Sequence, residues 1–359
     1  MSQNATVRFE FLDALRGIAA IYVLFFHLAR YNCGPQLVAN GLLAVDFFFI
    51  LSGLVIAAAY EHRFRDGMTF AGFVRVRAIR LLPMAMLSVV LGTSFIVLRH
   101  FIGDGPQDSM TGTIAAFVLN LFLIPKLWYE NWSEYQIFPS NAALWSLFFE
   151  VSINLVWAFA LVRASNRVLM TVVAIAAILL VSEIVRADSP NLGWSSLTLL
   201  DGFARVTFGF TVGVLIYRYH DKLKGPPLLC GALAFVLLTA ATFFPLQSIA
   251  WWLPAILLML PVAVASGAAA AGTGIMPAEQ WLGRLSYPIY AIHMPIVHYL
   301  PGIQKRIFGE EDIGAPGLLW AFPIIAAAWL ALRFYDEPVR AWLSRVTRKP
   351  APEMVKGGH

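Results

Sequence analysis

Long runs of apolar residues alternate with short polar segments along almost the whole chain. At about 20 residues per crossing, ten of these runs are expected to be transmembrane helices. We place them at 11–29, 41–60, 81–98, 143–162, 168–185, 203–217, 228–245, 251–271, 285–300 and 316–332. A shorter apolar stretch, 112–127, is expected to be an interfacial or re-entrant helix. The pattern therefore predicts an all-α membrane protein, a polytopic bundle of about ten helices.

The composition fits this prediction. Hydrophobic residues make up 59% of the 359 positions and charged residues only 13%, against roughly 25% charged residues in soluble globular domains. A single soluble domain, a disordered chain, a coiled coil and a disulfide scaffold are therefore excluded. No nucleic-acid module and no cluster of metal ligands is visible, so we expect neither a nucleic-acid partner nor a metal.

The basic residues predict the orientation. With the N-terminus in the cytoplasm, eighteen of the 26 lysines and arginines fall in inside segments and six outside, with Arg16 and Arg205 within spans. This bias follows the positive-inside rule. It predicts cytoplasmic termini in a bacterial inner membrane, with one transmembrane domain over 1–340 and a basic cytoplasmic tail over 341–359. A crossing by 112–127 would reverse every later loop.

Four residues bear on processing and redox state. Glu10 and Asp13 interrupt the basic region that a signal peptide needs, so the first helix is expected to be retained. Cys33 and Cys230 are the only cysteines. The predicted topology puts them on opposite sides of the membrane, so we expect no disulfide.

Arg16 and His27 lie in the first span, eleven positions apart. Eleven residues of helix make three turns plus roughly 20°, so both side chains face the same way, about 16 Å apart along the axis. Ionisable groups at membrane depth are costly and indicate function. Asp13, one turn before Arg16, can pair with it. The alternative is a snorkelling arginine and a histidine that only packs.

Three further spans carry polar residues on one face. Ser146 and Glu150 are one turn apart, and we expect Glu150 near the depth of His27, where it could orient the imidazole or instead pair with Arg205. Asp46 lies near the outer surface, either in a site or as a cap. The late span carries a polar stripe at i, i+4 and i+7, consisting of Ser286, Tyr290 and His293. With Pro288 and Pro295, this helix is expected to line a cavity, although His293 could equally be a packing residue.

Arg75, Arg77 and Arg80 form the densest basic cluster, which we expect in a cytoplasmic loop. Arg77 and Arg80 are i, i+3 neighbours that can reach one anion, and the planar guanidinium suits phosphate. The alternative is a loop that only sets topology and meets anionic lipid.

In order along the chain, these motifs resemble the membrane-bound acyltransferase 3 family of bacterial O-acyltransferases. The matching segments are Leu12–Gly17 with His27 eleven positions after Arg16, Val45–Gly53, Arg77-x-x-Arg80 with Pro83, Leu144-Trp145-Ser146-Leu147 with Glu150, Gly283–His293 and Glu337-Pro338. Asn154 and Leu155 depart from the aromatic residues that members often carry after the glutamate. We also expect no hydrolase-like periplasmic domain after the bundle.

The resemblance implies transfer of an acyl group, often acetyl, from cytoplasmic acyl-CoA to a hydroxyl of an extracytoplasmic or membrane-associated glycan. It implies that Arg75, Arg77 and Arg80 bind the CoA phosphates and that Arg16 guides the donor. His27 acts as general base or acyl carrier, and Glu150 orients it. The remaining expected substrate contacts are Trp145, Ser146, Arg205, Asp46, Tyr290 and His293. A transporter or flippase for a glycolipid is the alternative, because polar residues also line transport paths.

Overall fold

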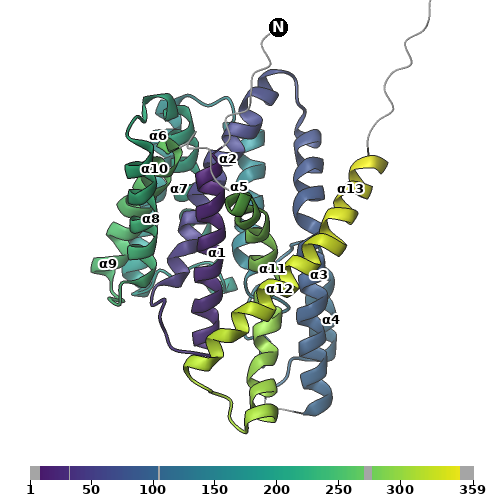
Figure 1. Ribbon diagram of the computed structural model, residues 1–359. Helices are drawn as coiled ribbons and strands as arrows, with labels where there is room; N and C mark the ends of the chain where they lie inside the picture. The colour runs from purple at the N-terminus through teal and green to yellow at the C-terminus, as the bar shows by residue number, and fades with distance from the viewer. Residues whose placement is uncertain (1–8, 32, 104–105, 271–276, 348–359) are drawn as a thin grey trace, which may run out of the picture.

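The computed structural model describes residues 9–31, 33–103, 106–270 and 277–347 (Figure 1). Within these ranges every extended regular element is a helix, and the sole β contact is an isolated bridge between Gln136 and Ser195. The all-α prediction is confirmed.

The helices follow the predicted apolar runs. They are α1 Glu10–Arg30, α2 Ala44–Arg65, α3 Phe70–Ile102, α4 Met110–Leu121, α5 Leu144–Val156, α6 Asn166–Ala187, α7 Leu199–Arg218, α8 Pro227–Phe243, α9 Ile249–Pro254, α10 Leu260–Ala269, α11 Pro277–Phe308, α12 Ala321–Ala331 and α13 Glu337–Val346. Short π-helical segments extend α5 (η2, Trp157–Leu161), join α9 to α10 (η5, Ala255–Met259) and join α12 to α13 (η7, Leu332–Asp336). Short 3-10 helices occur at η1 Gly41–Leu43, η3 Ser196–Thr198, η4 His220–Lys222 and η6 Ala315–Trp320.

Eight continuous helical stretches in the described residues are long and apolar enough to cross a membrane. They match eight of the ten predicted spans. The other two predicted spans are also helical, 228–245 in the 17-residue α8 and 285–300 inside α11. The protein is thus a multi-pass membrane protein.

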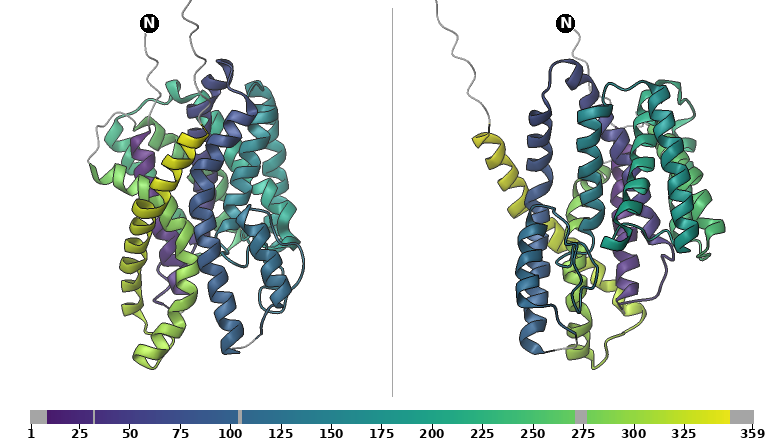
Figure 2. Two further views of the ribbon diagram at one scale, coloured as in Figure 1. Left: turned by 90° about the vertical axis from the view of Figure 1, so that its right-hand side faces the viewer. Right: turned by 180° about the vertical axis from the view of Figure 1, so that it is seen from behind.

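The stretch 112–127 forms only one short helix. α4 has 12 residues, or about 18 Å of helix, which is less than the roughly 30 Å hydrocarbon core. It packs beside the lower half of the long α3 (Figure 2). Its length is that of the interfacial or re-entrant helix expected here.

The prediction of a cytoplasmic loop around Arg75, Arg77 and Arg80 is wrong, because all three lie in α3. Thr69 caps this helix by accepting a hydrogen bond from the backbone N–H of Gly72, which satisfies one of the free donors of the first turn. After Gly72 in the first turn, no glycine or proline occurs before Pro83, and a transmembrane helix tolerates proline. The three arginines are therefore held in position by one continuous helix.

Two pairs of helices form the centre of the bundle, α1 with α11 and α2 with α7. Glycines allow the second pair to approach closely. A Cβ on Gly53 would lie 1.9 Å from the carbonyl oxygen of Phe210, and one on Gly213 would lie 1.9 Å from that of Ile50. Small residues play this role in membrane helix pairs because lipid provides no hydrophobic force to join them.

The first and last helices bring the described chain back to one end of the bundle. α1 begins, and α13 ends, towards the top of Figure 1. α13 continues to Val346, so the predicted domain boundary at 340 falls inside a helix. The rest of the predicted tail, 348–359, lies outside the described residues, and the cytoplasmic location of this end stays a prediction.

Candidate active site

Arg16 is fixed in the interface between α1 and α11. Its Nε donates to Ser286 Oγ at 2.9 Å and its Nη2 donates to the carbonyl oxygen of Gly283 at 2.9 Å. Asp13 forms the predicted ion pair with it at 3.0 Å. The arginine therefore points into the protein and does not snorkel to the lipid surface.

His27 contacts the same neighbouring helix three turns later. Its Nδ1 lies 3.1 Å from Nε2 of His293 and 3.0 Å from the carbonyl oxygen of Val23. Both Arg16 and His27 thus turn towards α11, as their spacing predicts. The polar stripe of α11 meets them, with Ser286 at Arg16 and His293 at His27.

The hydrogen bonds of the two imidazoles decide where their protons lie. Nδ1 of His293 faces the carbonyl oxygens of Ile289 and Tyr290 at 3.1 and 2.8 Å, and a carbonyl can only accept, so this nitrogen carries hydrogen. Nε2 of His293 is then an acceptor, and Nδ1 of His27 must be the donor to it. We assign these tautomers from the network. In these tautomers Nε2 of His27 carries no hydrogen and can accept a proton. It is not a buried atom that lacks a hydrogen-bond partner.

A cavity of about 190 Å³ lies between α1, α2, α3, α5 and α11. Along α2 it reaches from Phe48 to Tyr60, about 18 Å of helix. Its polar lining consists of Arg16, Ser52, Tyr60, Arg77, Arg80, Ser146, Glu150, Ser286, Tyr287 and Tyr290. The prediction that α11 lines a cavity is confirmed by these contacts.

The cavity ends beside the histidine pair. Tyr290 lines it, and the Tyr290 and His293 rings lie 5.8 Å apart between centroids. The Tyr290 hydroxyl lies 2.6 Å from Ser146 Oγ, and both residues line the cavity. Phe48 packs edge-on against the Tyr290 ring. Tyr290 thus lies both at the cavity and beside His293.

The predicted pairing of Glu150 with His27 is wrong, and so is its alternative, a pair with Arg205. Oε1 of Glu150 accepts hydrogen bonds from Ser52 Oγ and from Nη2 of Arg77, each at 3.0 Å. The reason is the position of α5, which packs on α2 and α7, whereas the partner of α1 is α11. Glu150 is a cavity residue that holds Arg77.

Asp46 and Arg205 form a buried ion pair with two hydrogen bonds, at 2.8 and 2.7 Å. Arg205 also donates to the carbonyl oxygens of Leu42 and Leu192, and its guanidinium lies 5.4 Å from the Trp145 ring centroid. Asp46 is therefore not an exposed cap. Asp46, Trp145 and Arg205 are absent from the cavity lining.

The three arginines of α3 differ in their contacts. Arg75 is exposed and donates to the carbonyl oxygen of Thr347 in the chain after α13. Arg77 is buried and paired, whereas Arg80 lies exposed at the cavity and forms no hydrogen bond or ion pair within the described residues. Arg75 does not line the cavity.

Ser52, whose mid-membrane position beside Gly53 predicts only helix packing, is a cavity residue. It lies one turn after Phe48 on the face of α2 that lines the cavity. The spacing of Phe48, Ser52 and Ile56 at i, i+4 and i+8 is the signal that could have found it.

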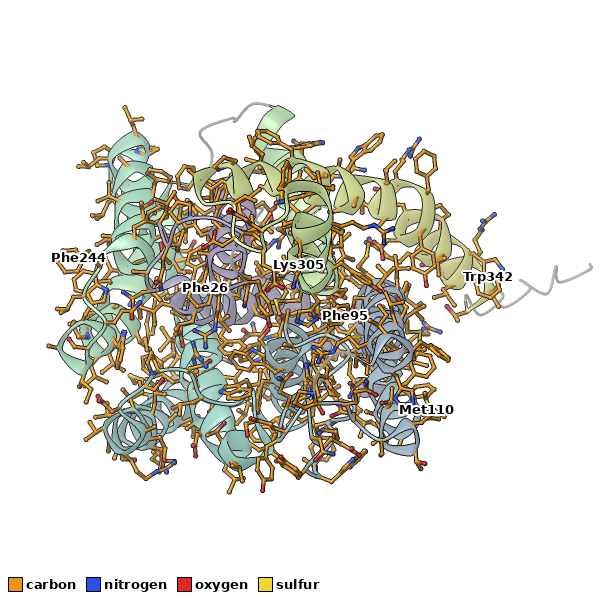
Figure 3. All side chains as sticks on the ribbon, turned by 90° about the horizontal axis from the view of Figure 1, so that it is seen from below. Phe26, Phe95, Met110, Phe244, Lys305 and Trp342 are labelled. Atoms are coloured by element: carbon orange, nitrogen blue, oxygen red, sulfur yellow. The ribbon has the colours of Figure 1, made fainter. Side chains whose placement is uncertain are left out.

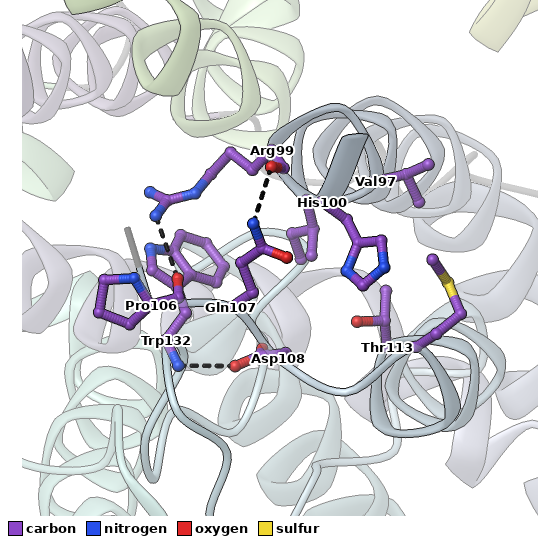
Figure 4. A pocket seen from close by; sticks show the side chains of 10 residues that line it. Val97, Arg99, His100, Pro106, Gln107, Asp108, Thr113 and Trp132 are labelled. Carbon is purple, nitrogen blue, oxygen red and sulfur yellow. Dashed lines mark hydrogen bonds between the residues drawn. The ribbon is translucent and has the colours of Figure 1, made fainter. Parts of the chain in front are cut away.

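A second, much smaller pocket lies at the C-terminal end of α3 (Figure 4). Asp108 accepts hydrogen bonds there from the backbone N–H groups of Trp132 and Ser133. The neighbouring Lys126 is buried, and this burial lowers its pKa while Asp108 and Glu130 oppose the effect. These contacts tie the segment after α4 to the segment between α3 and α4 and leave little room for a ligand.

Comparisons with known proteins agree with this geometry. The sequence model of acyltransferase 3, described as an acyltransferase domain, matches residues 9–335. The chain belongs to the acyltransferase 3 family. No solved structure matches it.

Three relatives illustrate the similarity of this acyltransferase. A Rhizobium radiobacter protein named protein 2 in the picA locus is 32% identical over 50% of the chain and 96% of its own length. A Staphylococcus aureus protein provisionally named an O-acetyltransferase is 27% identical over 39% of the chain and 22% of its own. A Bacillus subtilis protein provisionally named a peptidoglycan O-acetyltransferase is 24% identical over 92% of the chain and 54% of its own. The chain thus spans about half of the last protein and about a fifth of the staphylococcal one.

Proposed function

We propose that this acyltransferase moves an acyl group, most simply acetyl, from acyl-CoA to a hydroxyl of a glycan. The observation that supports the proposal best is the cavity itself, which leads from Arg80 past Arg16 to Tyr290, beside the histidine pair. The names of the Staphylococcus and Bacillus relatives support acetyl as the group, and that of the Bacillus relative supports a glycan acceptor.

The end of the cavity that carries the arginines has the charge needed to bind the donor. Arg80 has no counter-ion within the described residues, and Arg16 and Arg77 lie along the same cavity. Arginine binds phosphate through paired N–H donors, so the phosphates of CoA would lie at this end, on the cytoplasmic side of a bacterial inner membrane. The thioester would then point along the cavity towards Tyr290.

His27 would act as the general base. Its free Nε2 takes the proton of the acceptor hydroxyl while that oxygen attacks the thioester carbonyl carbon. The oxyanion of the tetrahedral intermediate would receive a hydrogen bond from the Tyr290 hydroxyl, whose oxygen would accept one from Ser146. The C–S bond then breaks, and the CoA thiolate takes the proton back from His27, so that the products are ester and free thiol. His293 positions the imidazole throughout.

Mass spectrometry of surface glycans tests the proposal. Glycans from cells that express the wild-type protein should carry one more acyl unit than those from a deletion strain, and His27→Ala should match the deletion. His62→Ala, which changes an exposed histidine paired with Asp66, is the control and should match the wild type. Glycans that reach the surface unacylated in every strain would contradict acyl transfer, and loss of the whole glycan in the deletion strain would favour transport.

A further inference from the structure

Of four arginines around the cavity mouth, three contact a carboxylate and one does not. Arg16 and Arg77 each contact their own carboxylate, as described above. Arg340 of α13 also has one, because its Nη1 lies 2.7 Å from Oδ2 of Asp336. Arg80 contacts no carboxylate among the described residues, and Asp336, which pairs with Arg340, acts on it only at longer range. Clustered cations repel one another unless an anion joins them.

Arg340 belongs to this cluster by its position. α13 packs against α3 as it leaves the bundle (Figure 1), and Arg80 lies within electrostatic reach of Arg16, Arg77 and Arg340. Asp336 is fully buried at the end of η7 and holds Arg340 one turn later. Arg340 itself is only half-buried, so its remaining donors can reach a ligand.

The outer face of α13 fits a helix at the membrane surface. Trp342 is 56% exposed and lies at the edge of the molecule (Figure 3). Arg340 lies within electrostatic reach of Arg80 on α3. Arg345, on the same helix, is exposed and bonded only to its own helix backbone within the described residues. The helix thus offers one arginine to the cavity mouth and a second one that can serve as a control.

The size of the cavity indicates which part of a donor reaches Arg340. At about 190 Å³ it is smaller than the roughly 300–1,000 Å³ of pockets that enclose a drug-sized ligand. It has room for a narrow thioester arm, and a nucleotide with its phosphates must remain at the mouth.

We propose that Arg340 and Arg80 together bind a phosphate group on the nucleotide portion of the donor. This inference rests on the proposed function and extends it to α13, which lies beyond the matched residues 9–335. The phosphate completes the charge balance of Arg80, and Asp336 acts as a positioning residue that aims Arg340.

Donor kinetics with the purified full chain in lipid nanodiscs test the inference. Arg340→Gln should raise KM for acetyl-CoA about tenfold, the effect of losing one charge-assisted hydrogen bond, and should leave kcat unchanged. KM for S-acetylpantetheine, which has no phosphate, should not change. Arg345→Gln should behave as the wild type with both donors. Arg340→Lys, which keeps the charge, should recover part of the affinity.

Every other outcome contradicts either the inference or the proposed function. An unchanged KM for acetyl-CoA, or an equal rise for both donors, overturns the inference and leaves the proposed function intact. A defect that appears only in nanodiscs containing phosphatidylglycerol, and not in phosphatidylcholine alone, assigns Arg340 to a lipid phosphate and also overturns it. Absence of transfer by the wild-type protein from either donor contradicts the proposed function itself.

Discussion

His27 donates a hydrogen bond from Nδ1 to Nε2 of His293 across 3.1 Å, and this contact fixes which nitrogen of His27 is free. Because the other imidazole is held by two backbone carbonyls of its own helix, the pair is oriented from α11. The proposed general base on α1 therefore depends on a residue 266 positions later.

His293→Gln tests this dependence. The variant removes the rigid acceptor for His27, so the imidazole can rotate and its free nitrogen is no longer held in place. We expect kcat to fall about 10²-fold, at the lower end of what a general base contributes, with KM for the donor little changed. Initial rates of transfer at saturating donor give the answer. His298→Gln, on the same helix, is the control, and a fully active His293→Gln protein would contradict the assignment.

Arg80→Gln should weaken donor binding. The side chain has no other partner within the described residues, so its loss removes a donor contact without breaking an internal ion pair. We expect KM for acetyl-CoA to rise about ten- to a hundredfold, since hydrogen bonds to charged groups contribute about 1.5–3 kcal/mol. Arg75→Gln, outside the cavity, should change KM less than twofold by the same measurement. Equal effects of the two substitutions would argue against a phosphate at Arg80.

Asp46→Asn should destabilise the protein without altering donor affinity. It leaves the buried guanidinium of Arg205 without its counter-ion, a change that typically costs about 3–5 kcal/mol. Thermal unfolding in detergent should show a clear fall in midpoint temperature. The double variant Asp46→Leu with Arg205→Met removes both charges and should recover much of the stability. If the single variant unfolds at the wild-type temperature, the pair is not structural.

Gly53→Ala and Gly213→Ala should each separate α2 from α7. The new Cβ atoms would lie 1.9 Å from the carbonyl oxygens of Phe210 and Ile50, and backbone cannot move aside cheaply. Overpacking typically costs about 1–3 kcal/mol, measured here by thermal unfolding. Gly302→Ala, with no atom within 4 Å of the new Cβ, is the matched control and should be neutral or stabilising. Wild-type stability of both interface variants would contradict the close helix contact.

Cys33 should resist thiol reagents at neutral pH. Its burial, with a smaller effect of Asp312, raises the pKa of the thiol to about 11. Because the thiolate is the nucleophile, the labelling rate should rise about tenfold per pH unit between pH 7 and 10. In single-cysteine variants, maleimide labelling of Cys230, which is half-exposed, should be faster at pH 7.

The same Cys230 variant tests the predicted topology. If a membrane-impermeant maleimide labels Cys230 only in inverted vesicles, the result supports the predicted topology. Labelling of Cys230 in intact cells would refute it.

The sequence by itself determined the helices and which side chains share a face of each. Membrane crossings depend on local apolar length, and the helical repeat places Arg16, Asp13 and His27 on one side of α1 whatever surrounds them. The stripe on α11 follows from the same geometry. The ordered motifs indicated the family, because each of them is local in the chain.

Only the tertiary structure decided which helix faces pack against one another. Glu150 is at a plausible depth for His27, yet it contacts Arg77, because the lateral order of helices depends on close packing such as that at Gly53 and Gly213. Asp46 and Arg205 are 159 positions apart, and no local pattern links them. The depth of a residue in the membrane follows from its position along its own helix. The residues that it contacts depend on how all the helices of the bundle pack together.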